Sequence, residues 1–358
     1  MKHNRIVIKI GSNVLTRMDG TLDHTRISSL VDQVGTLYRS GLEVVLISSG
    51  AVASGRSELS IKKKLDTVSS RQLFSSVGQV KLINTYYNLF RELGITCGQV
   101  LTTKESFSSR GHYLNQKNCI NTMLENGIIP IINENDTISV TELMFTDNDE
   151  LSGLIATMVQ ADVLVILSNV DGIYDGNPND ESSQIIKEID KDTQLSDYIS
   201  PDKSQFGRGG MLTKSRISQK VASEGIEVII TNGSRDNILT DLLLNKNEVL
   251  STHFLPSKKV ITGVKKWIAH SESFTKGKII INQGAYDAIL NNKVVSILPI
   301  GILSVEGDFE KDDIISILSP DGTYIGLGKT SYNSELAREL MGVKGQKPII
   351  HYDYLYIE

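Results

Sequence analysis

An acidic stretch in the middle of the chain carries residue types that bind a cation. Asp147, Asn148 and Asp149 stand directly before residues 151–159, an apolar segment with helical spacing. Carboxylates this close repel each other, and the dipole of a helix N-terminus relieves only part of that repulsion. A cationic ligand, a metal ion or lysine side chains are therefore expected opposite these groups. An acidic N-cap is the alternative, because Asp and Asn are usual residues at a helix start.

A second polar cluster follows residues 128–132, a short apolar segment that predicts a buried strand. Ligands of open α/β sheets bind beyond the carboxyl ends of the strands, where this cluster would lie. Asn and Asp also form turns after strands, but a run of four polar residues favours a binding site. The cluster consists of Asn133, Glu134, Asn135 and Asp136.

Two turns after predicted strands offer groups to an anion. They contain Lys9 and Gly11, at the end of residues 5–10, and Ser49, Gly50 and Ala51, after residues 43–47. Lysine, hydroxyl and backbone N–H groups in such turns can face phosphate or carboxylate oxygens. For each of them an ordinary turn is the alternative, since glycine is common after a strand.

A glycine-rich segment, residues 206–214, precedes a predicted helix at residues 215–223. Three glycines with Arg208 and Lys214 at a helix N-terminus are typical of an anion cradle, and a surface loop is the alternative. The spacing is neither that of a Walker loop nor that of a dinucleotide-binding fingerprint. With Asp149 to hold them, Lys9 and Lys214 supply what phosphoryl transfer mainly needs, which is positioning and neutralised charge.

Strands and helices alternate along the first 250 residues, which predicts a mostly parallel open sheet with helices on both faces. Strands are predicted at residues 5–10, 43–47, 95–101, 128–132, 162–167 and 226–230, and helices between Asp23 and Gly41 and at residues 68–93, 113–125 and 215–223. The pattern changes after Pro256 to short β-like segments separated by turns, which predicts a small β-rich barrel or sandwich. These segments are residues 278–281, 294–298, 301–305, 313–318 and 324–327. The domain boundaries are therefore set at 1–257 and 258–358.

Composition narrows the function classes. The 358 residues suit two domains, and the formal net charge of −5 offers no footprint for nucleic acid. Two cysteines, Cys97 and Cys119, argue against a disulfide framework and fit a reducing cytoplasm. The six histidines are scattered without metal-ligand spacing, so no protein metal site is expected. The sequence shows neither an N-terminal export signal nor a long apolar run. The chain is therefore expected to be soluble, and neither exported nor inserted into a membrane.

Several of these motifs, taken in order, resemble the glutamate-phosphorylating branch of the amino acid kinase family. They are residues 9–12 (KIGS), 48–51 (SSGA), 132–136 (INEND), 147–152 (DNDELS) and 209–214 (GGMLTK). The C-terminal part resembles a PUA domain. That resemblance rests on residues 266–268 (KWI), 276–277 (KG), 284–285 (GA), 301–302 (GI), 305–309 (VEGDF) and 332–334 (YNS).

The resemblance implies ATP-dependent phosphorylation of the L-glutamate γ-carboxylate, the first step of proline biosynthesis. It further implies Mg²⁺ with ATP, feedback inhibition by proline and a homo-oligomer. Lys9 and Lys214 would stabilise the moving phosphoryl group, and Asp149 would orient them. The glutamate site would comprise Ser49, Gly50, Ala51, Asn133, Asn135, Asp136, Asp147 and Asn148. The nucleotide site would comprise Lys9, Gly11, Ser168, Asn169, Arg208, Gly209, Gly210, Met211, Leu212, Thr213 and Lys214.

Two positions depart from the pattern of the family. Asn169 follows Ser168 where an aspartate is common, which keeps the hydroxyl but loses a charge. Arg208 stands before the two glycines in place of a small or hydroxyl residue. The first departure bears on nucleotide binding, and the second offers a contact to phosphate or to solvent.

Three other functions are alternatives. A related kinase of acetylglutamate, aspartate or a nucleotide would share the fold but is not expected to carry the C-terminal module. An RNA-binding protein is the second alternative, but residues 258–358 hold 12 basic and 12 acidic residues, without the cationic excess that RNA affinity needs. An inactive scaffold is the third, and the joint presence of Lys9, Lys214, Asp136 and Asp149 argues against it.

Overall fold

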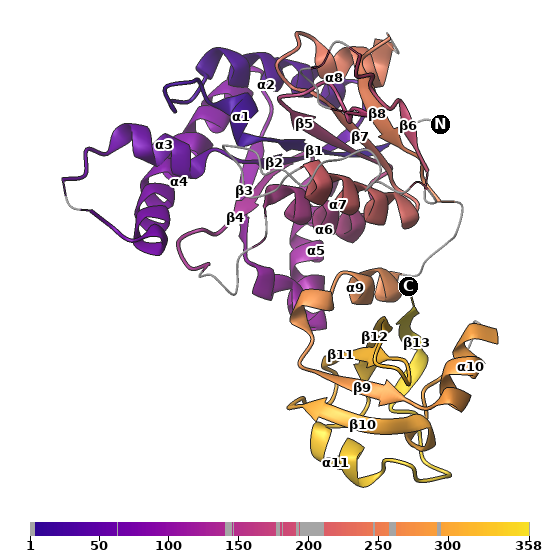
Figure 1. Cartoon of the computed structure of the whole chain (residues 1–358). Coiled ribbons are helices and arrows are strands. Elements are labelled where there is room, and N and C mark those ends of the chain that lie inside the picture. The colour runs from indigo at the N-terminus through magenta and orange to yellow at the C-terminus, as the bar shows by residue number, and fades with distance from the viewer. Residues whose placement is uncertain are drawn as a thin grey trace. The chain divides into compact units, whose positions relative to one another are not determined.

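A computed structural model divides the chain into two compact units (Figure 1). Unit 1 comprises Met1–Ser106 and Leu114–Val260, and unit 2 comprises Phe107–Tyr113 and Ile261–Glu358. The structure describes residues 4–62, 64–139, 145, 147–176, 180, 182–190, 193, 211–245, 248–257, 263–291 and 295–357. No helix among these residues is long and apolar enough to cross a membrane.

The described strands of unit 1 form one sheet in the order β3-β4-β2-β1-β5-β7-β8-β6. The strands are β1 (Arg5–Ile10), β2 (Glu43–Ser48), β3 (Cys97–Thr102), β4 (Ile129–Glu134), β5 (Val163–Ser168), β6 (Glu188–Ile189), β7 (Glu227–Asn232) and β8 (Ser251–Phe254). All pairs are parallel except that of β7 with β8. The strand order reverses at β1, which lies between β2 and β5, so their carboxyl ends meet at a switch point where ligands bind in such sheets.

Helices cover both faces of this sheet, and Figure 1 shows α2 and α8 over one face and α6 and α7 over the other. The helices of unit 1 are α1 (Ser12–Leu15), α2 (His24–Arg39), α3 (Ala51–Glu58), α4 (Thr67–Glu92), most of α5 (Arg110–Glu125), α6 (Asn148–Val159), α7 (Met211–Ser223) and α8 (Ile238–Thr240), with shorter turns at Lys104–Phe107 and Asp241–Asn245. The predicted N-cap of α2 is confirmed, because the Asp23 carboxylate accepts the Arg26 N–H at 3.1 Å. The predicted mostly parallel sheet with helices on both faces is confirmed as well.

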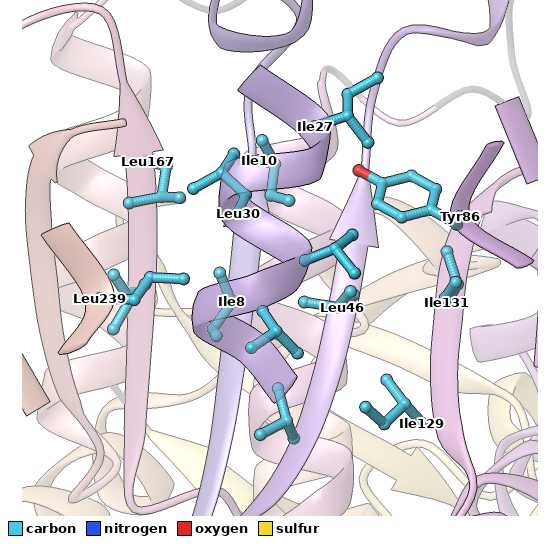
Figure 2. Packing of buried hydrophobic residues seen from close by; sticks show 14 of the residues in the cluster. Ile8, Ile10, Ile27, Leu30, Leu46, Tyr86, Ile129, Ile131, Leu167 and Leu239 are labelled. Carbon is cyan, nitrogen blue, oxygen red and sulfur yellow. The ribbon is translucent and has the colours of Figure 1, made fainter. Parts of the chain in front are cut away.

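One hydrophobic core of unit 1 lies between the sheet and α2 (Figure 2). Ile8 and Leu46, on neighbouring strands, face Leu30 of α2 and are fully buried. Tyr86 of α4 closes one side of this core, and its hydroxyl lies 3.0 Å from the Ser48 Oγ. Burial raises the pKa of Tyr86 to about 12. The apolar packing therefore holds rigid the strands whose carboxyl ends carry the polar residues.

Two glycines allow α3 and α4 to approach each other at backbone distance. A Cβ added to Gly78 would lie 1.8 Å from the Ala51 carbonyl oxygen, and one added to Gly55 would lie 1.8 Å from the Phe74 carbonyl oxygen. Any larger side chain would push the helices apart. This contact fixes the start of α3, and with it the turn at Ser49 and Gly50.

The described strands of unit 2 form a second sheet in the order β10-β9-β11-β12-β13. These strands are β9 (Gly277–Ile281), β10 (Ile302–Gly307), β11 (Ile314–Leu318), β12 (Tyr324–Thr330) and β13 (Ile350–Ile357), and the helices are α9 (Gly263–Ala269), α10 (Gln283–Asn291) and α11 (Ser334–Glu339), with short turns at Glu272–Phe274 and Pro299–Gly301. The Trp267 Nε1 donates to the Phe107 carbonyl at 3.0 Å, and the Arg110 guanidinium lies over the Trp267 ring. A segment from the first half of the chain thus belongs to the second unit.

The prediction of a strand at residues 294–298 is wrong for residues 295–298, the part of this range that the structure describes. Within residues 295–298, Ile297 makes an isolated bridge to Ile350, and the chain then enters a short helical turn at Pro299. Proline has no backbone N–H and a fixed φ, which ends strand pairing there. The long strand β13 was not predicted, although it pairs with β12 along the sheet.

Candidate functional site

The carboxylate of Asp149 is the centre of the candidate site, because two lysines meet on it. The Lys9 Nζ of β1 lies 2.6 Å from the Asp149 Oδ1, and the Lys214 Nζ of α7 lies 2.5 Å from the Asp149 Oδ2. All three side chains are buried. Both interpretations of the acidic stretch therefore hold, since lysines face it and the Asp147 Oδ1 caps α6 by accepting the N–H groups of Asp149 and Glu150.

The charges at this centre are strongly coupled. Burial alone raises the pKa of the Asp149 carboxyl, but Lys214 and Lys9 outweigh burial and hold that pKa well below its usual range. Burial lowers the pKa of Lys9, against the attraction of Asp149. Asp147 differs, because burial and the nearby Asp149 charge raise the pKa of Asp147 to about 6. One ionised carboxylate thus anchors two buried ammonium groups.

This arrangement leaves donors available to a ligand. Each ammonium group carries three N–H donors, and one carboxylate oxygen faces each of them. Gly11 keeps the space beside Lys9 open, since a Cβ there would lie 3.6 Å from the Lys9 Nζ and 3.1 Å from the Leu167 carbonyl oxygen. The centre can therefore bind an anion with several charged oxygens, such as a phosphoryl group.

Polar side chains from three elements meet next to this centre. The Asn148 Nδ2, at the start of α6, donates to the Ser49 Oγ at 2.9 Å and to the Asn133 Oδ1 at 3.1 Å. Ser49 follows β2, and Asn133 lies within β4. Gly50 adopts a φ of 102°, a left-handed conformation that favours glycine, and leads into Ala51 and the free amides at the start of α3. The structure thus brings together residues that are up to 99 positions apart.

The other residues predicted for this cluster take different positions. Asp136 is buried beyond the end of β4, where Arg71 of α4 forms an ion pair with it. The Asn135 Oδ1 accepts the Thr137 hydroxyl at 2.5 Å, which is the role of a turn former. Residue-type reasoning missed Arg71, the Glu134 carboxylate that also forms an ion pair with it, and Gln79, whose Oε1 accepts the Asn133 Nδ2 at 2.9 Å. A basic or amide residue on a predicted helix is ordinarily a solvated one, so the sequence carried no signal for them.

Several of the residues predicted for the nucleotide lie at the end of β5 and at the start of α7. Ser168 ends β5, and Asn169 after it is exposed. Met211, Leu212 and Thr213 form the first turn of α7, followed by Lys214. Arg208, Gly209 and Gly210 lie outside the described residues. The Asn232 Nδ2 at the end of β7 donates to the Asp171 Oδ1 at 3.0 Å. Neither residue was among those predicted for the site.

Comparisons with known proteins agree on the family. The model of the amino acid kinase family matches residues 4–232, and that of the PUA domain matches residues 277–352. A glutamate 5-kinase of Bacteroides thetaiotaomicron is 63% identical over 99% of this chain and 98% of its own length. A glutamate 5-kinase of Chlorobaculum tepidum is 48% identical over 99% of this chain and 98% of its own length.

Solved structures show the same fold at low sequence identity. A carbamate kinase from Giardia lamblia bound to AMP-PNP has a TM-score of 0.52 and 16% identity over 71% of this chain and 99% of its own. An isopentenyl phosphate kinase has a TM-score of 0.52 and 18% identity over 70% of this chain and 100% of its own.

Proposed function

This chain belongs to the amino acid kinase family, among the glutamate 5-kinases, and we propose that Lys9, Lys214 and Asp149 form its phosphoryl-transfer centre. The chain phosphorylates the side-chain carboxylate of L-glutamate with ATP, the first step of proline biosynthesis. The observation that carries the residue assignment is the pair of buried lysines on one buried carboxylate, at the carboxyl end of β1. ATP consumption measured in parallel with glutamate, aspartate, N-acetylglutamate and UMP tests the function. Turnover with glutamate alone is expected, and turnover with another acceptor in its place would contradict the assignment.

The two lysines act on the group being transferred. Charge on that group spreads over its equatorial oxygens in the transition state, so fixed cations lower the barrier without reorganising. Asp149 keeps the two ammonium groups side by side, where they would otherwise repel each other. The lysines therefore stabilise the transferring phosphoryl group, and Asp149 holds the lysines in place.

Mg²⁺ is proposed to arrive with ATP. Mg²⁺ usually binds through substrate phosphates and one or two carboxylates, and it would neutralise charge on the phosphates of the nucleotide. Asp149 faces the lysines, so among the described residues of this centre Asp147 is the carboxylate that fits such a metal.

We assign Gly11, Ser168, Asn169 and residues 208–214 to the nucleotide site. Feedback inhibition by proline, assembly into a homo-oligomer and action in the cytoplasm are further proposals.

The glutamate site is proposed at the carboxyl ends of β2 and β4. Carboxylates and amide oxygens there can accept the substrate ammonium, and the first amides of α3 can donate to a substrate carboxylate. Asn148 touches both Ser49 and Asn133, so it joins the two parts of the site. The site comprises Ser49, Gly50, Ala51, Asn133, Asn135, Asp136, Asp147 and Asn148.

Asp136→Ala and Asn148→Ala are each expected to raise the KM for glutamate by roughly 10-fold or more and to leave the KM for ATP almost unchanged. Each change removes a polar partner of the acceptor and leaves the lysines in place. Steady-state kinetics with each substrate varied in turn measures both constants. Asp32→Ala and Asn126→Ala, at exposed positions on α2 and after α5, are matched controls. The opposite pattern, with ATP affected and glutamate not, would mean that the two sites are interchanged.

The chain is proposed to divide at residue 257, with residues 258–358 as a separate PUA-like domain. A chain ending at Leu255 is expected to fold and to phosphorylate glutamate, because the proposed site residues precede that position. Its melting temperature should fall, since Phe107 and Tyr113 lose the packing of Trp267 within unit 2. Full-length Trp267→Leu is the control that removes only this ring. A folded truncated chain without kinase activity at saturating substrates would place part of the active site beyond residue 255.

A further inference from the structure

Polar side chains of α4 hold the turn that follows β4. The Arg71 Nε donates to the Asp136 Oδ1 at 2.6 Å, and the Arg71 Nη2 donates to the Glu134 Oε2 at 2.7 Å. The Gln72 Nε2 donates to the Thr137 carbonyl at 2.8 Å. One helix thus fixes both ends of the segment that carries Asp136.

The ion pairs of Arg71 leave this group with one unit of negative charge. Glu134 is 3% and Asp136 is 7% exposed, and both carboxylates face the same guanidinium. Burial raises the pKa of Glu134, Arg71 opposes this, and the charge of Asp136 adds to it. Both other members of the group therefore act on the Glu134 carboxyl, together with the Phe145 N–H and the Ser139 hydroxyl. Two carboxylates with one guanidinium carry a net charge of −1.

Glu134 also connects this group to the phosphoryl-transfer centre. The Glu134 Oε1 accepts the Phe145 N–H at 3.0 Å, and Phe145 stands two residues before Asp147, the N-cap of α6. Asn133, beside Glu134 in β4, accepts from Asn148 and donates to Gln79 of α4 at 2.9 Å. A change at Glu134 would therefore act on the charge of the acceptor site and on the position of α6.

We propose that Arg71 and Glu134 are positioning residues that set the charge of their group with Asp136 to −1, which selects an acceptor with one free ammonium group. The proposal rests on the function assigned above. An α-amino dicarboxylate brings one ammonium, which one net negative charge matches. Without the Glu134 charge, Arg71 would neutralise Asp136, and the ammonium would meet a group without net charge. Without Arg71, two carboxylates would face each other, and a purely anionic ligand would be repelled more strongly.

A comparison of glutamate with glutarate binding tests the charge of this group, because glutarate is the same dicarboxylate without the amino group. The readout is the Ki of glutarate as a competitive inhibitor, divided by the KM for glutamate. General loosening of the site raises both constants and leaves the ratio unchanged. A change in site charge moves the ratio, because only glutamate carries the cation.

Glu134→Gln keeps the size of the side chain and an oxygen for the Phe145 N–H, but removes one negative charge. It is expected to raise the KM for glutamate roughly 10-fold and to lower the ratio by a similar factor, with kcat nearly unchanged. Arg71→Gln is expected to raise the ratio, because two facing carboxylates without the guanidinium repel glutarate more strongly. The double variant Arg71→Gln/Glu134→Gln restores a charge of −1 and should return the ratio toward its original value.

Arg91→Gln is the matched control, since it removes an arginine from an exposed position on the same helix. Melting curves identify variants that fold, and Arg71→Gln tests the proposal independently if Glu134→Gln does not fold. An unchanged ratio in both folded single variants, or a double variant no closer to the original ratio, would overturn the inference. A protein of the original sequence that fails to phosphorylate glutamate would instead overturn the proposed function on which the inference rests.

Discussion

Lys9→Ala and Lys214→Ala are each expected to lower kcat by roughly 10²- to 10³-fold, with a much smaller change in the KM for glutamate. Each lysine faces the buried Asp149 carboxylate and has further N–H donors for the phosphoryl group. Because charge on that group develops during transfer, loss of a fixed cation weakens the transition state more than the bound substrates. The effect should therefore appear in kcat.

Steady-state kinetics at saturating ATP measures this effect. Lys220→Ala is a matched control, because it removes a lysine six residues later on α7. Lys214→Met, which keeps most of the side-chain length, separates the loss of charge from the loss of packing. A near-normal kcat in Lys9→Ala or Lys214→Ala would remove that lysine from the mechanism.

The spacing of apolar residues, and the residues typical of helix ends, predicted most of the elements that position this site. The apolar runs of β1, β2 and β5 are buried on both faces, and such strands read as continuous Ile, Val and Leu segments. Asp23 and Gly41 marked the ends of α2 because capping and left-handed glycine have strong residue preferences. These signals are local, so the sequence displays them directly.

The residues that make up the site were harder to predict from the sequence. The strand before the polar cluster was expected to end at Ile132, but β4 continues through Asn133 and Glu134. Strand pairing with β3 decides this, since Leu101 pairs with Asn133 and Thr102 with Glu134. Polar residues in a strand have low intrinsic β-propensity, and the tertiary partner overrides that preference. The sequence therefore placed Glu134 beyond the strand, in the polar cluster that favoured a binding site.

Long-range partners explain the other omissions. Arg71 is separated from Asp136 by 65 residues, and nothing near Arg71 in the sequence distinguishes it from a solvated arginine on a helix. The family resemblance implied that Ser49 and Asn148 share one glutamate site, and their side chains form a hydrogen bond although they are 99 positions apart. Topology rules locate strand ends, but they do not specify which helix side chain reaches them.

Asp149→Asn is expected to reduce both stability and kcat. The amide has nearly the same size as the carboxylate, but it leaves Lys9 and Lys214 buried beside each other without their shared anion. Removing one member of a buried ion pair typically costs about 3–5 kcal/mol of folding free energy. The pKa of Lys9, already lowered by burial, should fall further, so that this lysine tends to lose its charge. We expect kcat to fall by roughly 10²-fold, because the two cations are then neither aligned nor fully charged.

Urea denaturation separates this electrostatic cause from a general packing defect. Asp149→Asn/Lys214→Met removes one of the two repelling charges and should be more stable than Asp149→Asn alone, although it carries an additional substitution. ATP should also raise the melting temperature of Asp149→Asn more than that of the original protein, because the phosphates replace the missing negative charge. If the double variant were less stable than the single one, and ATP stabilised both proteins equally, Asp149 would not be the anion that holds the lysines together. The centre would then owe its geometry to packing of β1, α6 and α7.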